Sequence, residues 1–270
     1  GQPRADSVVL WTMLTGAGLP ERVDVTWEVA DDDAFAHVIA RGRESAVLDD
    51  AHSVHAEPVG LPPGRWLWYR FRALGQSSPI GRTRTAPQAE ANVGSFEFAI
   101  ASCQRYDVGH YAAWRHVAQE NLDAVIFVGD YIYEYPSNAK SVRPLEGAGI
   151  VRTLAQYRAR YATHKSDPAL QAAHAAAPWL LVWDDHEVGN DYAGLQGQAL
   201  EVDFRAQRAA AYRAYWEHMP FPKSARPLDA DMRITARLDW GRLARLQLID
   251  DRQAQAAIRA GRVELNGRVA

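Results

Sequence analysis

Cysteine is almost absent from this chain, because Cys103 is the only one among 270 residues. A single thiol excludes an internal disulfide and any metal site built from several thiolates. Cys103 is therefore a free thiol, a lone metal ligand or a small buried side chain at the end of a strand. It is the first residue to consider as a candidate ligand.

The chain also lacks a strong charge of one sign and any long hydrophobic run. Its 30 basic and 33 acidic side chains give a formal net charge of -3. This balance provides no general attraction for nucleic acid or anionic lipid, and no nucleic-acid-binding patch is evident. The longest apolar runs, around Ala124–Val128 and Pro178–Trp183, are far shorter than the roughly 18–20 residues of a membrane-spanning helix. The sequence therefore predicts no transmembrane segment, and no signal peptide opens it.

The composition that remains is that of a globular protein, with 47% hydrophobic and 23% charged residues. At roughly 100–200 residues per domain, the length favours two domains. Alternating runs at Val23–Ala30 and Leu67–Ala73, with a third candidate at Ser7–Leu14, predict short strands of a β-sandwich. The polar stretch Gly75–Gly94 is typical of a linker. We therefore expect an N-terminal β-sandwich domain over residues 1–88 and a second domain over residues 93–270.

The second part of the chain alternates predicted strands with predicted helices, which indicates an α/β layered core. Its strands are expected at Phe96–Ala101, Asp123–Val128 and Trp179–Trp183, and a terminal hairpin at Ile234–Leu238 and Leu243–Ile249. Helices are expected at His110–Glu120, Val151–His164, Pro168–Ala177 and Phe204–His218.

Chemically useful side chains follow each of these three strands. They lie in Ser102–Arg105, in Gly129–Glu134 and in Asp184–Glu187. Ligands of layered α/β folds bind beyond the carboxyl ends of the strands, so the three segments are expected to converge. A thiolate, carboxylates, a phenol and an imidazole together suit a hard cation beside a more Lewis-acidic transition metal.

Each residue alone also has an ordinary structural interpretation. Asp130 is a plausible turn or helix cap, Tyr133 a packing aromatic, and Asp185 with His186 a buried hydrogen-bonded pair. The combination of Gly-Asp with a tyrosine three residues later, and then Asp-His-Glu after another apolar strand, favours a metal site.

The motif Gly129-Asp130-Tyr131-Ile132-Tyr133 resembles the Gly-Asp-x-x-Tyr signature shared by purple acid phosphatases and PhoD-type alkaline phosphatases, within the calcineurin-like metallophosphoesterases. Trp183–Val188 resembles the PhoD-type version of the superfamily's Gly-Asn-His-Asp/Glu block. Three further segments resemble parts of the same family. The start of the family's sandwich domain resembles Pro3–Leu14, and its first metal-binding block resembles Ala101–Gln104. Its Leu-Asp-Thr-Arg-Gln segment resembles Ile249–Gln253. The resemblance covers nearly the whole chain.

This resemblance implies an α+β/α/β multidomain fold, with an N-terminal immunoglobulin- or fibronectin-like β-sandwich followed by a four-layer αββα metallophosphatase core. The later metal-binding blocks of that core have no counterpart after Gln253, so we expect the core to be incomplete at the C-terminus. The implied activity is a metal-dependent phosphoric-ester hydrolase of alkaline phosphatase or phosphodiesterase type. In such enzymes a metal-bound hydroxide attacks a small phosphate-ester substrate.

The resemblance also implies Fe3+ with Ca2+ nearby. Carried over by motif, Cys103 and Tyr133 would bind the iron, Asp130 would bridge to the second metal, and Asp185 would bind that second metal. His186 would stabilise the transition state or protonate the leaving oxygen.

Further candidates lie beside these residues. Asn190, with Asp191, would add an oxygen to calcium or only shape the turn. Arg105 and Arg252 are candidate phosphate clamps, with structural arginines as the alternative. Glu134 receives no role.

The sequence alone is therefore compatible with two functions. One is a phosphoric-ester hydrolase, exported to the periplasm or the extracellular space as the resemblance implies. The other is a non-catalytic truncated remnant that keeps a β-sandwich interaction module. Monoesters, diesters, nucleotides and phospholipid head groups all remain open as substrates, as does the oligomeric state.

Overall fold

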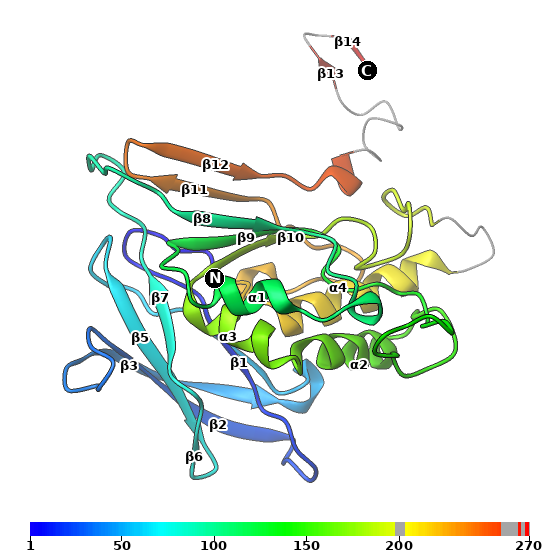
Figure 1. Cartoon of the computed structure of the whole chain (residues 1–270), viewed down its shortest axis with the longest axis horizontal. Coiled ribbons are helices and arrows are strands. Elements are labelled where there is room, and N and C mark those ends of the chain that lie inside the picture. The colour runs from blue at the N-terminus through cyan, green and yellow to red at the C-terminus, as the bar shows by residue number, and fades with distance from the viewer. Residues whose placement is uncertain (198–202, 255–263, 266–267, 270) are drawn as a thin grey trace.

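The computed structural model describes residues 1–197, 203–254, 264–265 and 268–269. The strands formed by the first 84 residues make up one part of the molecule. The part beside it contains the later strands and the helices that pack on them (Figure 1). The mixture of antiparallel sheets, one parallel sheet and helices among these residues is an α+β fold. No helix within these residues has the length and hydrophobicity to cross a membrane.

The N-terminal strands form two antiparallel sheets. One has the order β3-β2-β5-β6, with β7 also paired to β5, and the other is the pair β1-β4. The strands are β1 (Leu10–Met13), β2 (Arg22–Ala30), β3 (Val38–Val47), β4 (Ser53–Ala56), β5 (Trp66–Ala73), β6 (Gln76–Ser77) and β7 (Gly81–Arg84). Alternation along β2 buries Val23, Val25 and Val29 in a core that both sheets share with Leu10 and Val54.

The linker predicted over Gly75–Gly94 is wrong in its first half, because β6 and β7 lie within it. Gly81 pairs with Tyr69, and a Cβ at Gly81 would lie 2.3 Å from the Tyr69 ring. This glycine therefore marks a close approach inside a sheet rather than a break between domains. Residues 85–94 contain no strand or helix.

The second part of the chain is built on three parallel strands in the order β10-β9-β8. These strands and the terminal hairpin are close to the predicted positions: β8 (Phe98–Ala101), β9 (Ala124–Val128), β10 (Trp179–Val182), β11 (Ala236–Trp240) and β12 (Ala244–Leu248). The pair β13 (Glu264–Leu265) and β14 (Arg268–Val269) follows. The prediction that Ala254–Ala270 contains no apolar strand ending in metal ligands lies largely outside the described residues.

Helices were expected in four places and are found in all four. They are α1 (Ala112–Val117), α2 (Leu154–Lys165), α3 (Pro168–Ala176) and α4 (Phe204–His218). Thr153 forms a capping box with Gln156 at the start of α2, and Asp167 caps α3 just before Pro168. These caps satisfy amide groups that would otherwise lack partners at the first turn.

The helices lie on one side of the β8–β10 sheet (Figure 1). The core between them is rich in aromatic side chains, among them Trp114, Phe127, Trp179 and Tyr215. On the other face of the sheet, Phe98, Ile100 and Val128 are exposed. The carboxyl ends of the three parallel strands point to the same edge of the sheet, where the polar segments follow.

Candidate metal centre

The segments that follow β8, β9 and β10 lie against one another, as the sequence predicts. The backbone amide of Cys103 donates to the carbonyl of Gly129 at 3.1 Å, and that of Gln104 donates to the carbonyl of Asp130 at 3.1 Å. These bonds fix the first segment to the second. They bring the side chains of Cys103 and Asp130 to the same place.

Gly129 allows the second and third segments to approach closely. Its φ is +103°, and a Cβ at this position would lie 2.4 Å from both the Cβ and the backbone nitrogen of Asp184. Cys103 (φ 56°) and Asp130 (φ 58°) are also left-handed, a conformation that is costly for residues other than glycine and concentrates at functional sites. The glycine of the Gly-Asp motif is therefore required by packing as well as by backbone geometry.

Asp130 is the centre of the cluster. Its Oδ2 accepts a hydrogen bond from the Tyr133 hydroxyl at 2.9 Å and lies 3.4 Å from the Cys103 sulfur. Its Oδ1 is buried and has no partner among the described residues. Asp130, Asp185 and His186 each offer a ligand atom within 4.8 Å of the other two.

This donor set fits a bound cation. A buried carboxylate oxygen without a hydrogen bond is costly unless a cation or a donor occupies the space beside it. Cys103 is exposed, which argues against its interpretation as a buried filler. A thiolate is a soft ligand, and carboxylate and phenolate oxygens are hard ones, so the side chains around Asp130 include donor atoms of both kinds.

Electrostatics around Tyr133 favour the neutral phenol as long as no cation is present. Burial, together with the hydrogen bond to Asp130 and the charge of Asp130, raises the pKa of Tyr133 well above its ordinary value. A multivalent cation beside the oxygen would reverse this effect, because it stabilises the phenolate directly.

Glu134, to which the sequence assigned no role, orients two parts of the cluster. One of its oxygens lies 2.8 Å from Nδ1 of His186, and the other accepts from the backbone amide of Asn190 at 2.8 Å. Burial lowers the pKa of His186, but the hydrogen bond and charge of Glu134 outweigh it and raise the pKa above its ordinary value. Glu134 thus favours a protonated His186 and leaves Nε2 as the ring nitrogen for chemistry. Its position directly after Tyr133 is the only sequence signal for this role.

Glu187 ties the second segment to the third. Its carboxylate accepts from the backbone amides of Tyr131 at 2.5 Å and Asp184 at 3.0 Å. Complete burial raises the pKa of Glu187 to about 8. Its contacts are with the backbone of the two segments, so it holds the loops rather than a ligand.

The remaining candidates lie at the edge of the cluster. Asn190 donates from its side chain to Asp191 at 2.8 Å, and the described residues show no hydrogen bond from it to Asp130 or Asp185. The backbone amide of Asp191 donates to Asp185 at 2.6 Å. Asn190 therefore shapes the turn around Asp185 in this structure.

The two arginines are both paired with carboxylates. Arg105 donates from Nε to Asp107 at 2.8 Å, and its guanidinium lies 5.6 Å from the centre of the Tyr133 ring. Arg252 donates from Nε to Asp184 at 2.6 Å and lies 3.2 Å from Asp185. Arg252 is thus the arginine that touches a residue of the cluster, while Arg105 reaches its rim.

Comparisons with known proteins agree with the motifs. The model of the PhoD-like phosphatase family matches residues 98–267, and that of the PhoD-like phosphatase N-terminal domain matches residues 1–87. Alkaline phosphatase D of Bacillus subtilis (strain 168) is 46% identical over 267 residues, which cover 94% of this chain and 46% of that protein. A solved structure described as PhoD superposes with a TM-score of 0.89 at 46% identity, covering 94% of this chain and 51% of the other. The chain therefore spans about half the length of these relatives.

Proposed function

Because the chain belongs to the PhoD-like phosphatase family, we propose that it forms the metal-binding part of a phosphoric-ester hydrolase that acts on small phosphate esters. The observation that carries this proposal is the Asp130 carboxylate. One of its oxygens contacts Tyr133 and Cys103, and the other is buried without a partner beside Asp185. Family membership is the basis for the proposed reaction class, and the cluster around Asp130 is the proposed site of the reaction.

The metals of the proposal are Fe3+ and Ca2+. Cys103, Asp130 and Tyr133 would hold the iron, because thiolate and phenolate ligands suit a trivalent transition metal. Asp185 would hold the calcium, and the side-chain oxygen of Asn190 would join it if the turn rotates. Such ions polarise phosphoryl oxygens and lower the pKa of water.

His186 is the proposed proton donor to the leaving oxygen. Its pKa is raised by Glu134, so the imidazolium that such a donor needs is favoured. Glu134 fixes the ring through Nδ1, and Tyr133 packs on the ring with centroids 4.2 Å apart. Arg252 would bring positive charge to the phosphate oxygens from beside Asp185, and Arg105 from beside Tyr133.

Two further assignments belong to the same proposal. The paired N-terminal sheets would be an immunoglobulin- or fibronectin-like sandwich, supported by their common apolar core. The β8–β10 sheet would be one half of a four-layer core, supported by the exposed Phe98, Ile100 and Val128 on the face opposite the helices. Export to the periplasm or extracellular space rests on the family resemblance.

The test is hydrolysis of p-nitrophenyl phosphate and its bis ester by the 270-residue chain supplied with iron and calcium. We expect Asp130→Asn to abolish turnover and Asp33→Asn, a change at an exposed aspartate away from the cluster, to leave it unchanged. Absence of turnover together with absence of metal binding would instead support the non-catalytic alternative.

A further inference from the structure

A large cleft separates the N-terminal strands from the helices, away from the metal centre. It has a volume of about 730 Å3, within the range of small-molecule sites. Strands β1 and β5 form one wall, and the end of α2 together with α3 forms the other. None of Cys103, Asp130, Tyr133 or Asp185 lines it.

Among the described residues that line the cleft, Lys165 is the only one with a side chain charged near pH 7. It is the last residue of α2, and its ammonium lies 4.1 Å from the centre of the Trp11 ring and 5.8 Å from that of Tyr131. Across the part of the chain that the structure describes, no carboxylate lies within ion-pair distance of it. Lys165 is partly buried among the lining residues.

The charge of this cleft is therefore uncompensated. Burial lowers the pKa of Lys165 to about 7, because the ammonium has lost hydration without gaining a counter-charge. His218 also lines the cleft, but burial lowers its pKa to about 3, so it is neutral near pH 7. A bound anion would restore what the Lys165 ammonium has lost.

The rest of the lining indicates what carries the anion. Trp11, Met13 and Pro79 line the cleft, are at least partly exposed and present apolar surface, while the hydroxyl-bearing Thr12 and Ser166 lie among the lining residues. We propose that the cleft binds an amphiphilic small molecule whose single anionic group, a carboxylate or a phosphate, contacts Lys165 and whose apolar part packs against Trp11, Met13 and Pro79. The proposal does not depend on the function of the metal centre.

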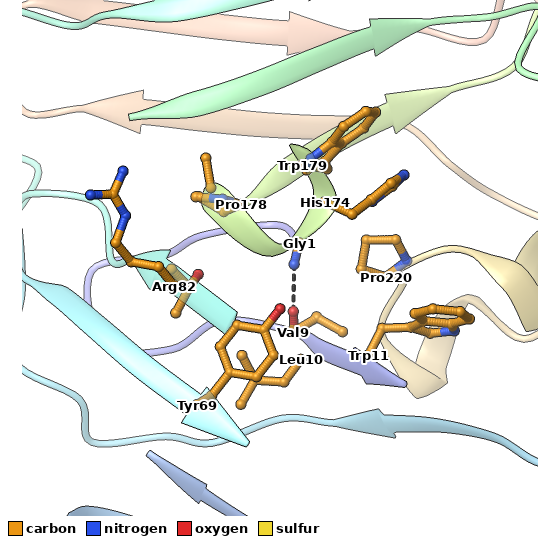
Figure 2. Close-up of a pocket in the computed structure, with 12 residues that line it drawn as sticks. Gly1, Val9, Leu10, Trp11, Tyr69, Arg82, His174, Pro178, Trp179 and Pro220 are labelled. Atoms are coloured by element: carbon orange, nitrogen blue, oxygen red, sulfur yellow. Dashed lines mark hydrogen bonds between the residues drawn. The ribbon is translucent and has the colours of Figure 1, made fainter. Parts of the chain in front are cut away.

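A smaller cavity shares Trp11 and Tyr69 with this cleft but is not part of the proposed site. Figure 2 shows Trp11 and Tyr69 on one side of it and His174 and Trp179 on the other. Its volume of about 40 Å3 has room for only a few water molecules. The ligand is therefore confined to the larger cleft.

The first experiment compares four twelve-carbon ligands by calorimetry. Each is used at a concentration at which it is dissolved as a monomer, and a metal chelator is present throughout. We expect dodecanoate, dodecyl phosphate or both to bind at least tenfold more tightly than dodecanol and dodecyltrimethylammonium. The stronger of the two anions identifies the head group. Equal binding of all four ligands, or binding of neither anion, would overturn the proposal.

The second experiment changes the charge. Lys165→Met should weaken binding of the preferred anion at least tenfold, whereas Lys165→Arg should retain most of it and Lys140→Met, at an exposed loop position, all of it. Circular dichroism and the melting temperature report whether Lys165→Met folds. Undiminished affinity in Lys165→Met would contradict the proposal, and the ligand series on the unchanged chain decides the matter if that variant does not fold.

Discussion

Individual residues of the cluster show how a short motif specifies a site. Asp130 adopts a left-handed backbone conformation, uses one oxygen for Tyr133 and Cys103, and leaves the other buried without a partner. Leaving a buried acceptor unsatisfied costs about 1–3 kcal/mol. A bound cation beside Oδ1 would offset that cost.

Replacing Tyr133 by phenylalanine tests the iron assignment. The phenyl ring keeps the packing on His186, so the fold should survive, but no phenolate remains for the metal. After reconstitution with ferric iron, the visible charge-transfer band of the unchanged protein should be absent from Tyr133→Phe. Tyr135→Phe, which alters a ring 5.5 Å from His186, serves as the control and should keep the band. Identical spectra for all three proteins would refute the assignment.

Replacing Glu134 by glutamine tests its control over His186. The charge that raises the pKa of His186 is removed, so the imidazolium should persist only to lower pH. A nuclear magnetic resonance titration of the His186 ring should show a lower pKa in Glu134→Gln, and any alkaline limb of the pH–rate profile should move in the same direction. Glu146→Gln, at an exposed position, should change neither. An unaltered His186 titration in Glu134→Gln would contradict the described pairing.

Among the secondary-structure elements, the sequence predicts most accurately the strands whose residues are almost all apolar and buried. β9 and β10 are continuous apolar runs, and the polar segments after them converge because parallel strands end at one edge. The sequence does not predict β3, because arginine and serine fill its exposed positions while Gly42 and Glu44 occupy the alternate ones, which leaves no apolar alternation to detect. The hydrogen bonds of Glu134 join residues more than 50 positions apart, and local spacing carries no signal for them.

Gly129 lets the segment after β9 pack closely against the segment after β10. Alanine there would place a Cβ 2.4 Å from Asp184 in a backbone conformation with φ +103°. We expect Gly129→Ala to lower the free energy of unfolding by about 2–3 kcal/mol, measured by urea denaturation, and to weaken metal binding through displacement of Asp130. Gly94→Ala is the matched control, since nothing lies within 4 Å of its added Cβ. Equal stability of the two variants would show that the close approach is not required.

Across the whole molecule, charges join the N-terminal sheets to the helices. Arg213 of α4 pairs with Asp49 at 2.9 Å and with Glu217 at 2.8 Å, and Arg158 of α2 pairs with the same Glu217 at 2.6 Å. Glu217 is fully buried, so its two arginine partners are what make its charge tolerable. The cleft at Lys165 also lies between N-terminal strands and helices.

Buried histidines predict how the stability of the whole molecule depends on pH. Burial lowers the pKa of His55 to about 4 and those of His164 and His218 to about 3. Between the ordinary histidine pKa near 6.5 and these values, the unfolded chain binds more protons than the folded one. The contribution of these histidines to stability should therefore fall as the pH drops from 7 to 5, by about 1–2 kcal/mol for each histidine. Glu187, whose pKa burial raises to about 8, changes stability in the opposite direction over the same range.

Urea denaturation at pH 7 and pH 5 measures this loss. His55→Phe keeps a ring against Trp216 and should show a shallower loss than the unchanged chain. His37→Gln should not flatten it, because the hydrogen bond that His37 donates to Asp31 raises the pKa of this exposed histidine. A loss of the same size in His55→Phe would mean that His55 is not buried as a neutral ring.

The most direct test of the metal centre is the iron content of the 270-residue chain after reconstitution with ferric iron and removal of excess metal. The arrangement around Asp130 predicts retained iron in the unchanged chain and in Asp33→Asn, and at least tenfold less in Asp130→Asn. Equal iron in Asp130→Asn and Asp33→Asn, with both variants folded, would contradict the assignment of this cluster as the metal centre.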